Sequence, residues 1–143
     1  MSSLFKKLNL GSHSTVHVLN APQSFESELA QLARLADVRV CRALSPKDRT
    51  AFAIAFAITR AELDAQSRKL IHAAEGDAII WMAYPKGTSR KYKCEFNRDT
   101  GWFVLQAAGY EPVRQVAIDE DWSALRFRSS DFVRGRRPAG RKG

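Results

Sequence analysis

The sequence predicts an α/β protein with a single doubly wound, mostly parallel sheet, finished by an antiparallel hairpin. Residues 51–58 and 78–84 are nearly unbroken apolar runs, which are typical of strands covered on both faces. Segments with helical apolar spacing separate the apolar runs, and two alternating runs follow near the end of the chain. Strands that alternate with amphipathic helices predict right-handed crossovers and helices on both faces of the sheet.

The first half of the chain supplies three strands and one helix. Residues 16–21 alternate and stop before a proline, as a strand does that ends in a loop. Ser24 is predicted to cap a helix over 25–35, whose apolar residues recur on one face. A second strand is predicted at 38–44 and a third at 51–58, with a polar break between them.

The second half adds two helices, a fourth strand and the hairpin. Thr59 and Glu62 have capping-box spacing and predict a helix that ends at Gly76. The fourth strand is predicted at 78–84, and a third helix starts at Asp99 or Thr100 and ends at Gly109. The hairpin strands are predicted at 112–119 and 123–129. The predicted strand order is 2-1-3-4-6-5.

Composition predicts one folded domain at residues 16–133, preceded by a lead-in at 1–15 and followed by a disordered basic tail at 134–143. Hydrophobic residues make up 45% and charged residues 27% of the 143 residues, as in ordinary globular proteins. The tail holds five of the eight net positive charges, which leaves +3 for the rest of the chain. Without a signal peptide or an apolar segment long enough to span a bilayer, the chain is predicted to be cytoplasmic.

The cysteines and histidines predict neither a disulfide nor a metal site. Cys41 and Cys94 lie in unlike contexts and are predicted to be free thiols. His13 and His17 stand about 13 Å apart in an extended chain, so one metal ion does not take both. His72 is predicted on a helix surface.

Four strings carry a resemblance to a known family: "VHVLNAP" at 16–22, "IIWMAYPKG" at 79–87, "NRDTGW" at 97–102 and "VRQVAIDEDWSALRFR" at 113–128. Together they resemble the bacterial proteins grouped as domain of unknown function 3052. The predicted strand order is similar to the class I methyltransferase version of the Rossmann fold. The family resemblance implies the fold and no established activity.

The loop after the first strand argues against a nucleotide cofactor. Ligands of such sheets bind at the carboxyl ends of the strands, where glycines let the backbone approach the ligand. Residues 20–25 contain no glycine, and Pro22 lacks an N–H group. Leu44 stands where an acidic residue would hold a ribose. We therefore predict no cofactor, no catalytic residue and no metal ligand.

A basic loop after the fourth strand is the best candidate for a site. It places four cations within eight residues, and its alternative interpretation is a solvated loop. The predicted ligand-rim candidates are Asn20, Gln23, Thr59, Lys86, Thr88, Ser89, Arg90, Asp119 and Trp122. The predicted nucleic-acid candidates are Lys91, Lys93, Arg134, Arg136, Arg137, Arg141 and Lys142. Trp122 and Trp102 are alternatively core residues, and the acids at 119–121 are alternatively a solvated hairpin turn.

Three functions stay open from the sequence. The first is a non-catalytic binding module for an anionic small ligand or a nucleic acid. The second is a small-molecule enzyme on a degenerate methyltransferase-like fold, with Lys86, Asp119 and Asn20 as its polar groups. The third is a structural protein whose exposed edge strand pairs with a second copy as a homodimer. No membrane partner is predicted.

Overall fold

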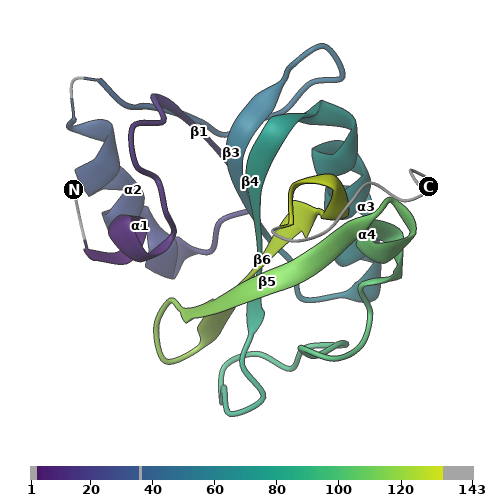
Figure 1. Cartoon of the computed structure of the whole chain (residues 1–143). Helices are drawn as coiled ribbons and strands as arrows, with labels where there is room; N and C mark the ends of the chain where they lie inside the picture. Colours follow the sequence, from purple (N-terminus) through teal and green to yellow (C-terminus); the bar gives the residue numbers. More distant parts are fainter. Residues whose placement is uncertain (1–2, 36, 134–143) are drawn as a thin grey trace, which may run out of the picture.

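The computed structural model describes residues 3–35 and 37–133 and contains one six-stranded sheet of order β2-β1-β3-β4-β6-β5 (Figure 1). This confirms the predicted fold class and strand order. Strands β1 to β4 are parallel neighbours, whereas β6 runs antiparallel to both β4 and β5. The strands are β1 (Thr15–Leu19), β2 (Arg39–Cys41), β3 (Thr50–Phe56), β4 (Ala74–Pro85), β5 (Tyr110–Ala117) and β6 (Trp122–Ser129).

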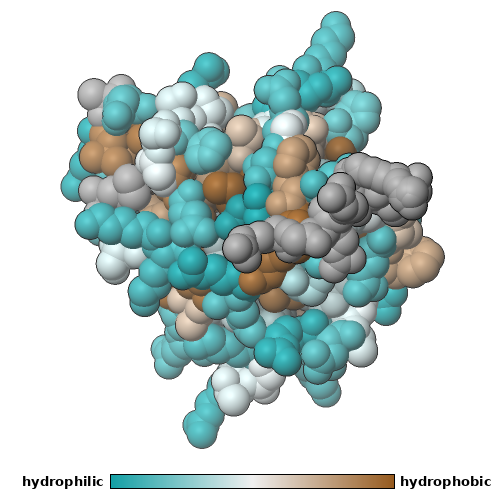
Figure 2. Space-filling view, in the orientation of Figure 1, coloured by the Kyte–Doolittle hydropathy of each residue, from teal (hydrophilic) through white to brown (hydrophobic). Residues whose placement is uncertain are grey.

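Helices cover both faces of the sheet. Figure 1 shows α1 and α2 on one side of it, and α3 and α4 on the other. Polar side chains cover much of the surface in Figure 2, with smaller apolar areas between them. The helices are α1 (Ser3–Lys7), α2 (Glu26–Ala33), α3 (Arg60–Ala73) and α4 (Phe103–Ala107), with short 3-10 turns η1 (Gln23–Phe25) and η2 (Ser130–Phe132). None of the described helices is long and apolar enough to cross a membrane.

The two central strands are buried on both faces, as their unbroken apolar runs predict. Phe52 and Phe56 of β3 pack on the α1 and α2 side, whereas Ala53 and Ala55 pack on the α3 side. The neighbouring β4 buries Trp81 on the first side and Met82 on the second. The two apolar cores thus meet at β3 and β4, and these strands hold the site at their carboxyl ends.

The capping box at the start of α3 is confirmed. The Thr59 hydroxyl accepts a hydrogen bond from the Glu62 N–H at 3.0 Å, and the Glu62 carboxylate accepts one from the Thr59 N–H at 3.0 Å. The same carboxylate accepts the Ile58 N–H at 2.8 Å. This arrangement satisfies backbone donors that the first turn of a helix leaves free, and it fixes the chain directly after β3.

Some predicted boundaries are wrong by one turn. Ser24 does not cap α2, because the 3-10 turn η1 precedes the helix and makes Phe25 its N-cap residue. Gly76, with a positive φ of 61°, lies inside β4, since that strand begins directly after α3. Helix α4 begins at Phe103, after Asp99 and Thr100, and β2 is shorter than its predicted span.

Helix α1 is an element that the sequence analysis did not predict. Its Leu4 and Phe5, with Leu8 just beyond it, are buried in the core on the α2 side. The Trp81 indole N–H donates to the Leu8 carbonyl at 2.9 Å, which ties this segment to the middle of β4. The apolar spacing of these three residues is helical, although the helix is only five residues long.

Candidate functional site

The chain leaves β1 through a tightly packed turn. Asn20 takes the left-handed conformation, with φ of 61°, and its amide donates to the Phe56 carbonyl at 2.9 Å. The same amide lies 3.4 Å from the Glu62 carboxylate. The Phe25 N–H then donates to the Pro22 carbonyl at 2.9 Å and closes the 3-10 turn. The Asn20 amide and the Phe25 N–H are therefore engaged with the protein itself, whereas the Gln23 and Ser24 side chains are exposed.

A row of aromatic rings lies beneath this turn. The ring of Phe25 is only 1% exposed and packs between Phe5 and Phe56, at centroid distances of 6.0 and 4.9 Å. Phe56 continues the row to Trp122 at 5.2 Å, and Trp122 contacts Tyr92 at 5.1 Å. The space directly below the exit of β1 is thus part of the hydrophobic core.

A small cavity of about 400 Å³ lies beside the ends of β1 and β2. Two cations line it, Arg42 and Lys69, and Arg42 is already bound through both guanidinium NH groups to the Glu26 carboxylate, at 2.9 and 2.6 Å. Gln66 contributes a buried carbonyl oxygen that has no hydrogen-bond partner among the described residues. The lining contains no acidic side chain; its residues are Leu19, Asn20, Arg42, Ala43, Leu44, Ser45, Gln66 and Lys69.

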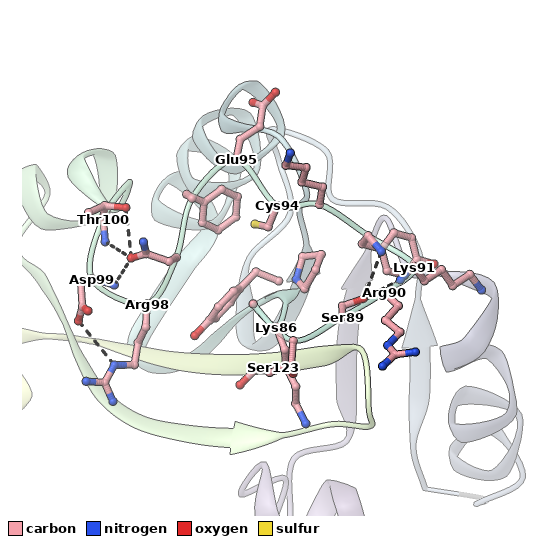
Figure 3. Close-up of a pocket in the computed structure, with 18 of the residues that line it drawn as sticks. Lys86, Ser89, Arg90, Lys91, Cys94, Glu95, Arg98, Asp99, Thr100 and Ser123 are labelled. Carbon is pink, nitrogen blue, oxygen red and sulfur yellow. Dashed lines mark hydrogen bonds and ion pairs between the residues drawn. The ribbon is translucent and has the colours of Figure 1, made fainter.

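The chain leaves β4 through a long loop that lines a much larger cavity of about 970 Å³ (Figure 3). This loop runs over residues 86–100, and Gln115 of β5 and Ser123 of β6 complete the cavity together with Tyr84 and Pro85. The basic loop of the sequence analysis is thus the wall of a cavity. The cavity lies against the face of the sheet that carries α3 and α4.

Hydrogen bonds tie the first part of this loop to the β5–β6 turn. The Ser89 hydroxyl donates to the Asp121 carboxylate at 2.8 Å and accepts the N–H groups of Lys91 and Tyr92 at 3.2 and 3.1 Å. The Lys86 N–H donates to the Asp121 carbonyl at 2.8 Å. The loop is therefore held in a defined course at its start.

The second part of the loop is tied to the start of α3. The Glu95 N–H donates to the Ile58 carbonyl at 3.0 Å, and the Glu95 carboxylate accepts the Arg60 N–H at 2.9 Å. Figure 3 shows the Glu95 side chain directed away from the cavity. This acid is thus engaged with the start of α3 and not with the cavity.

Three side chains form a polar floor at the base of the cavity: Tyr84, Gln115 and Ser123. The Gln115 amide donates to the Tyr84 hydroxyl at 3.1 Å and to the Ser123 hydroxyl at 3.0 Å. Tyr84 and Ser123 are each only 4% exposed, and burial raises the pKa of the Tyr84 hydroxyl. The floor is therefore neutral at pH 7, with its geometry fixed by its own hydrogen bonds.

Cationic side chains surround this floor, and few of them form an ion pair with an acid. An Arg98 guanidinium NH group lies 3.5 Å from the Gln115 amide oxygen, and the Arg98 Nε lies 3.6 Å from the exposed Asp99 carboxylate. Figure 3 shows Arg98 to one side of the floor and Lys86 beside Ser123. In the described part of the chain, no carboxylate forms an ion pair with Lys86, Arg90, Lys91 or Lys93.

The structure brings together only some of the predicted rim candidates. Lys86, Thr88, Ser89 and Arg90 all line the large cavity, as do Lys91 and Lys93. Asn20, Gln23 and Thr59 lie at the exits of β1 and β3, outside that lining. Asp119 accepts the N–H groups of Asp121 and Trp122 at 2.8 Å, which makes it the cap of the hairpin turn. Trp122 is 2% exposed and belongs to the aromatic row. The five tail candidates lie outside the described residues.

The remaining polar candidates have structural partners. The His17 ring nitrogen Nδ1 is 2.8 Å from the Thr50 hydroxyl, and burial lowers the pKa of this imidazole. His72 is exposed, as predicted, with Nε2 3.0 Å from the Pro46 carbonyl. Cys41 and Cys94 are free thiols, as predicted, and burial raises the pKa of Cys94. Among residues 3–35 and 37–133, no group of three or more His, Cys, Asp or Glu side chains is arranged to hold a metal ion.

Sequence reasoning missed several polar residues of the cavity, among them Arg98, Gln115 and Ser123. Gln115 and Ser123 alternate along the hairpin strands, so the period of two places each on one face. Which face that is depends on the register of β5 against β6, and this register shifts between Pro112 and Arg114. The polar floor is therefore a product of pairing between distant segments.

Several solved structures with a similar fold are methyltransferases. A SAM-dependent methyltransferase from Aquifex aeolicus has a TM-score of 0.57 and 12% identity, covering 88% of this chain and 87% of its own. The N-methyltransferase NodS from Bradyrhizobium japonicum WM9 has a TM-score of 0.59 and 11% identity, covering 89% and 93%. The magnesium protoporphyrin IX methyltransferase ChlM from Synechocystis PCC 6803, with bound SAH, has a TM-score of 0.56 and 10% identity, covering 89% and 78%.

These likenesses show the fold. The chain has the Rossmann-like fold of the class I SAM-dependent methyltransferases, with its mostly parallel sheet and antiparallel β4-β6-β5 part. No protein-family model matches the chain, and no curated protein matches it in sequence. The resemblance to the domain of unknown function 3052 proteins therefore stays a prediction.

The residues at the exit of β1 do not fit the cofactor that this fold class implies. An S-adenosylmethionine site on such a sheet needs backbone N–H groups that the ligand can approach and an acceptor for the ribose hydroxyls. Here Pro22 supplies no N–H, the Asn20 amide is bonded to Phe56, and Phe25 occupies the space beneath the turn. Strand β2 ends at Cys41, three residues before the predicted Leu44, and the residues that follow it, Arg42, Ala43 and Leu44, include no acid that could accept the ribose hydroxyls.

Proposed function

We propose that this protein is a non-catalytic binding module for an anionic small ligand, which the cavity at the exit of β4 holds. The observation that carries this proposal is the charge distribution in that cavity. Five cations line it, against two acids, and one of these acids, Glu95, is turned toward the start of α3. Unpaired cations around a neutral floor attract an anion more strongly than cations that are already paired.

The chemistry of the lining supports an oxyanion as the charged part of the ligand. Lys86 offers a flexible ammonium group, and Arg98 offers a planar fork of N–H donors that matches a carboxylate or a phosphate. Hydrogen bonds hold the loop at its start and at Glu95, so little ordering is needed when a ligand enters. A volume of about 970 Å³ is at the upper end of the range for small-molecule sites.

The small-molecule enzyme is less well supported. Lys86, Asp119 and Asn20 would have to converge on one substrate, but only Lys86 lines the cavity. The Asp119 carboxylate caps its own turn, and the Asn20 amide caps the exit of β3. Burial raises the pKa of the Cys94 thiol and of the Tyr84 hydroxyl, which disfavours their nucleophilic forms at pH 7.

The homodimer through a sheet edge is also less well supported. The edge strand β2 has three residues, which is too few to template a long pairing. The other edge strand, β5, contains Pro112 and a register shift directly after it. Prolines and bulges are the devices that keep edge strands from pairing with other chains.

Nucleic acid remains the alternative ligand of the same loop. Lys91 is exposed, with its ammonium group 5.6 Å from the centroid of the Tyr92 ring, so it is also available to a larger partner. The proposal also keeps two predictions that rest on sequence, namely membership in the domain of unknown function 3052 family and a cytoplasmic location. The sequence strings support the first.

Calorimetric titration of the full chain tests the proposal. The probes are small phosphates, mononucleotides, citrate and S-adenosylmethionine, with a single-stranded oligonucleotide as the nucleic-acid arm. We expect one small anion to bind and the double variant Lys86→Ala with Arg98→Ala to weaken it by about tenfold or more, because each charged hydrogen bond contributes about 1.5–3 kcal/mol. The matched control is Lys47→Ala with Arg68→Ala, which removes two exposed charges elsewhere. Equal affinity in both double variants would refute the site.

A further inference from the structure

A second cationic cluster lies on the opposite face of the sheet from the cavity. On β6, Trp122 and Ala124 face the core beneath α1 and α2. Because side chains alternate along a strand, Arg126 and Arg128 continue the same face. Arg114 of β5 pairs directly with Arg126 in the sheet register, so it belongs to this face as well. Figure 1 shows that β5 and β6 form the end of the sheet remote from β1.

Within this cluster, Arg128 is the arginine that forms an ion pair with an acid. Its guanidinium donates to both carboxylate oxygens of Asp77, at 2.9 and 2.6 Å. Glu111 lies across from Arg128 in the strand register, so the acids of this face gather at its outer end. The Asp77 carboxylate is committed to Arg128, which leaves Arg114 and Arg126 without an ion pair among the described residues.

Arg126 is held in an unfavourable position for a cation. Its Nε atom is buried and has no hydrogen-bond partner in the described chain. Arg114 stands directly opposite, and like charges in that arrangement destabilise a strand pair. Burial is the main cause that lowers the pKa of Arg126, with Arg128 and Arg114 acting in the same direction. A partly buried donor beside a second cation therefore lacks the anion that would satisfy both.

We propose that Arg114 and Arg126 form a second anion site, separate from the cavity, which binds a phosphate group. Two guanidinium forks present several N–H donors to one oxyanion, and guanidinium geometry matches phosphate in a bidentate manner. A bound phosphate relieves the repulsion between the two arginines and accepts hydrogen bonds from their guanidinium NH groups. Arg128, fixed by Asp77, stands behind them and raises the local positive potential.

The phosphate has two sources, an inorganic or mononucleotide phosphate and the phosphodiester backbone of a nucleic acid. Both offer the same oxygens to the two forks, and they differ in how many contacts lie beyond the site. A polynucleotide gains affinity from each further cation it neutralises, and that gain falls as salt rises. A small phosphate uses only the two forks.

The direct test records the arginine Nε–H resonances of the full chain in NMR spectra while inorganic phosphate is added at constant ionic strength. We expect the Arg126 signal to shift downfield and to saturate. The variants are Arg126→Met, Arg114→Gln and the matched control Arg68→Met on the exposed surface of α3. We expect the first two to weaken phosphate binding by about tenfold or more and the control to leave it unchanged.

Stability without phosphate separates binding from a structural role. Arg126→Met keeps an apolar stem and removes an unpaired charge, so its melting temperature without phosphate should equal or exceed that of the parent chain. Loss of the phosphate-induced shift at unchanged or higher stability supports the site. Destabilisation of Arg126→Met with an unchanged phosphate response overturns it. So does binding that disappears in the Lys86 and Arg98 double variant and persists in Arg126→Met, because it assigns the phosphate to the cavity.

A single-stranded oligonucleotide and a mononucleotide then identify the source of the phosphate. Tighter binding of the oligonucleotide that Arg114→Gln weakens, with a steep salt dependence, identifies a polynucleotide. Equal affinities that depend on Arg126 identify a small phosphate. The basic tail is present in every variant, so a difference between variants does not arise from it.

Discussion

The exits of β1 and β4 lie on the same edge of one sheet and are built in opposite ways. After β1 the chain turns within a few residues, engages its Asn20 amide with Phe56 and Glu62, and buries Phe25. After β4 it runs through a long polar loop that lines a cavity of about 970 Å³. The first exit packs its aromatic residue Phe25 into the core, and the second lines a cavity of defined shape.

This contrast determines where a ligand can bind on this sheet. The carboxyl edge of a doubly wound sheet is the general ligand position, but the edge must be open at the strand that supplies the site. Aromatic packing fills the space beneath the turn after β1 and leaves only the smaller cavity beside it, whereas bonds to Asp121 and to Arg60 hold the loop after β4 around its larger cavity. The candidate site is therefore displaced along the edge, away from the position that a nucleotide cofactor takes on such folds.

The largest expected effect comes from breaking the closed exit. Phe25→Ala removes a ring that packs between Phe5 and Phe56, and we expect it to lower the free energy of unfolding by about 3–5 kcal/mol. Urea unfolding measures the loss. The matched control is Phe103→Ala, because that ring is 71% exposed, and its cost should stay below about 0.5 kcal/mol. Similar costs for the two variants would show that the turn after β1 is not part of the core.

The next effect concerns the polar half of the same exit. Asn20→Ala removes the donor to the Phe56 carbonyl and places alanine at a positive φ, so we expect a loss of about 2 kcal/mol in unfolding free energy. Asn20→Gly removes the same bond and keeps the conformation accessible, and we expect about half that loss. Equal losses would mean that the left-handed conformation contributes nothing to the turn.

The sheet could be predicted from the sequence because the patterns that indicate its strands lie within short segments. The apolar runs at 51–58 and 78–84 reveal buried central strands, and the Thr59 and Glu62 spacing locates the start of α3. Helix α1 was not predicted because its five residues give too short a pattern of apolar spacing. The prediction that Ser24 caps the helix is wrong because residues 23–25 form a 3-10 turn, which moves the start of α2 to Glu26. These errors arise where packing against the core decides the conformation.

The candidate site could be predicted from the sequence only in part. The cations Lys86 and Arg90 follow a buried strand, and that position alone places them at the ligand edge. The polar floor needs Gln115 and Ser123 on one face, which the strand register decides. The arginine pair of β5 and β6 has the same origin, since nothing in the sequence pairs Arg114 with Arg126. Contacts between distant strands are the information that a single sequence lacks.

A smaller effect is expected from a substitution that removes hydrogen bonds of the loop after β4. Ser89→Ala removes the donor to Asp121 and the acceptor for the Lys91 and Tyr92 N–H groups, and we expect a loss of about 1 kcal/mol. Hydrogen exchange of those two amides should accelerate, while the amides of β4 stay protected. Thr88→Ala, at the exposed neighbouring position, is the control. Unchanged exchange in Ser89→Ala would mean that the hydroxyl does not hold the loop.

The smallest expected effect is a pH dependence of the stability that Glu62 contributes at the exits of β1 and β3. The N–H groups of Ile58 and Thr59 are the main causes that lower the pKa of Glu62 below its ordinary value of 4.5. A lowered carboxylate pKa gives stability that is complete above pH 4.5 and is lost as the pH falls through the folded-state pKa. Urea unfolding at pH 7 and pH 3 should therefore show that Glu62→Gln costs less at the acidic pH, by about a few tenths of a kcal/mol for an exposed carboxylate. Thr59→Ala removes the other half of the capping box without a titratable group, so its cost should be the same at both pH values. A cost of Glu62→Gln that does not change with pH would show that the carboxylate charge does not stabilise the exits of β1 and β3.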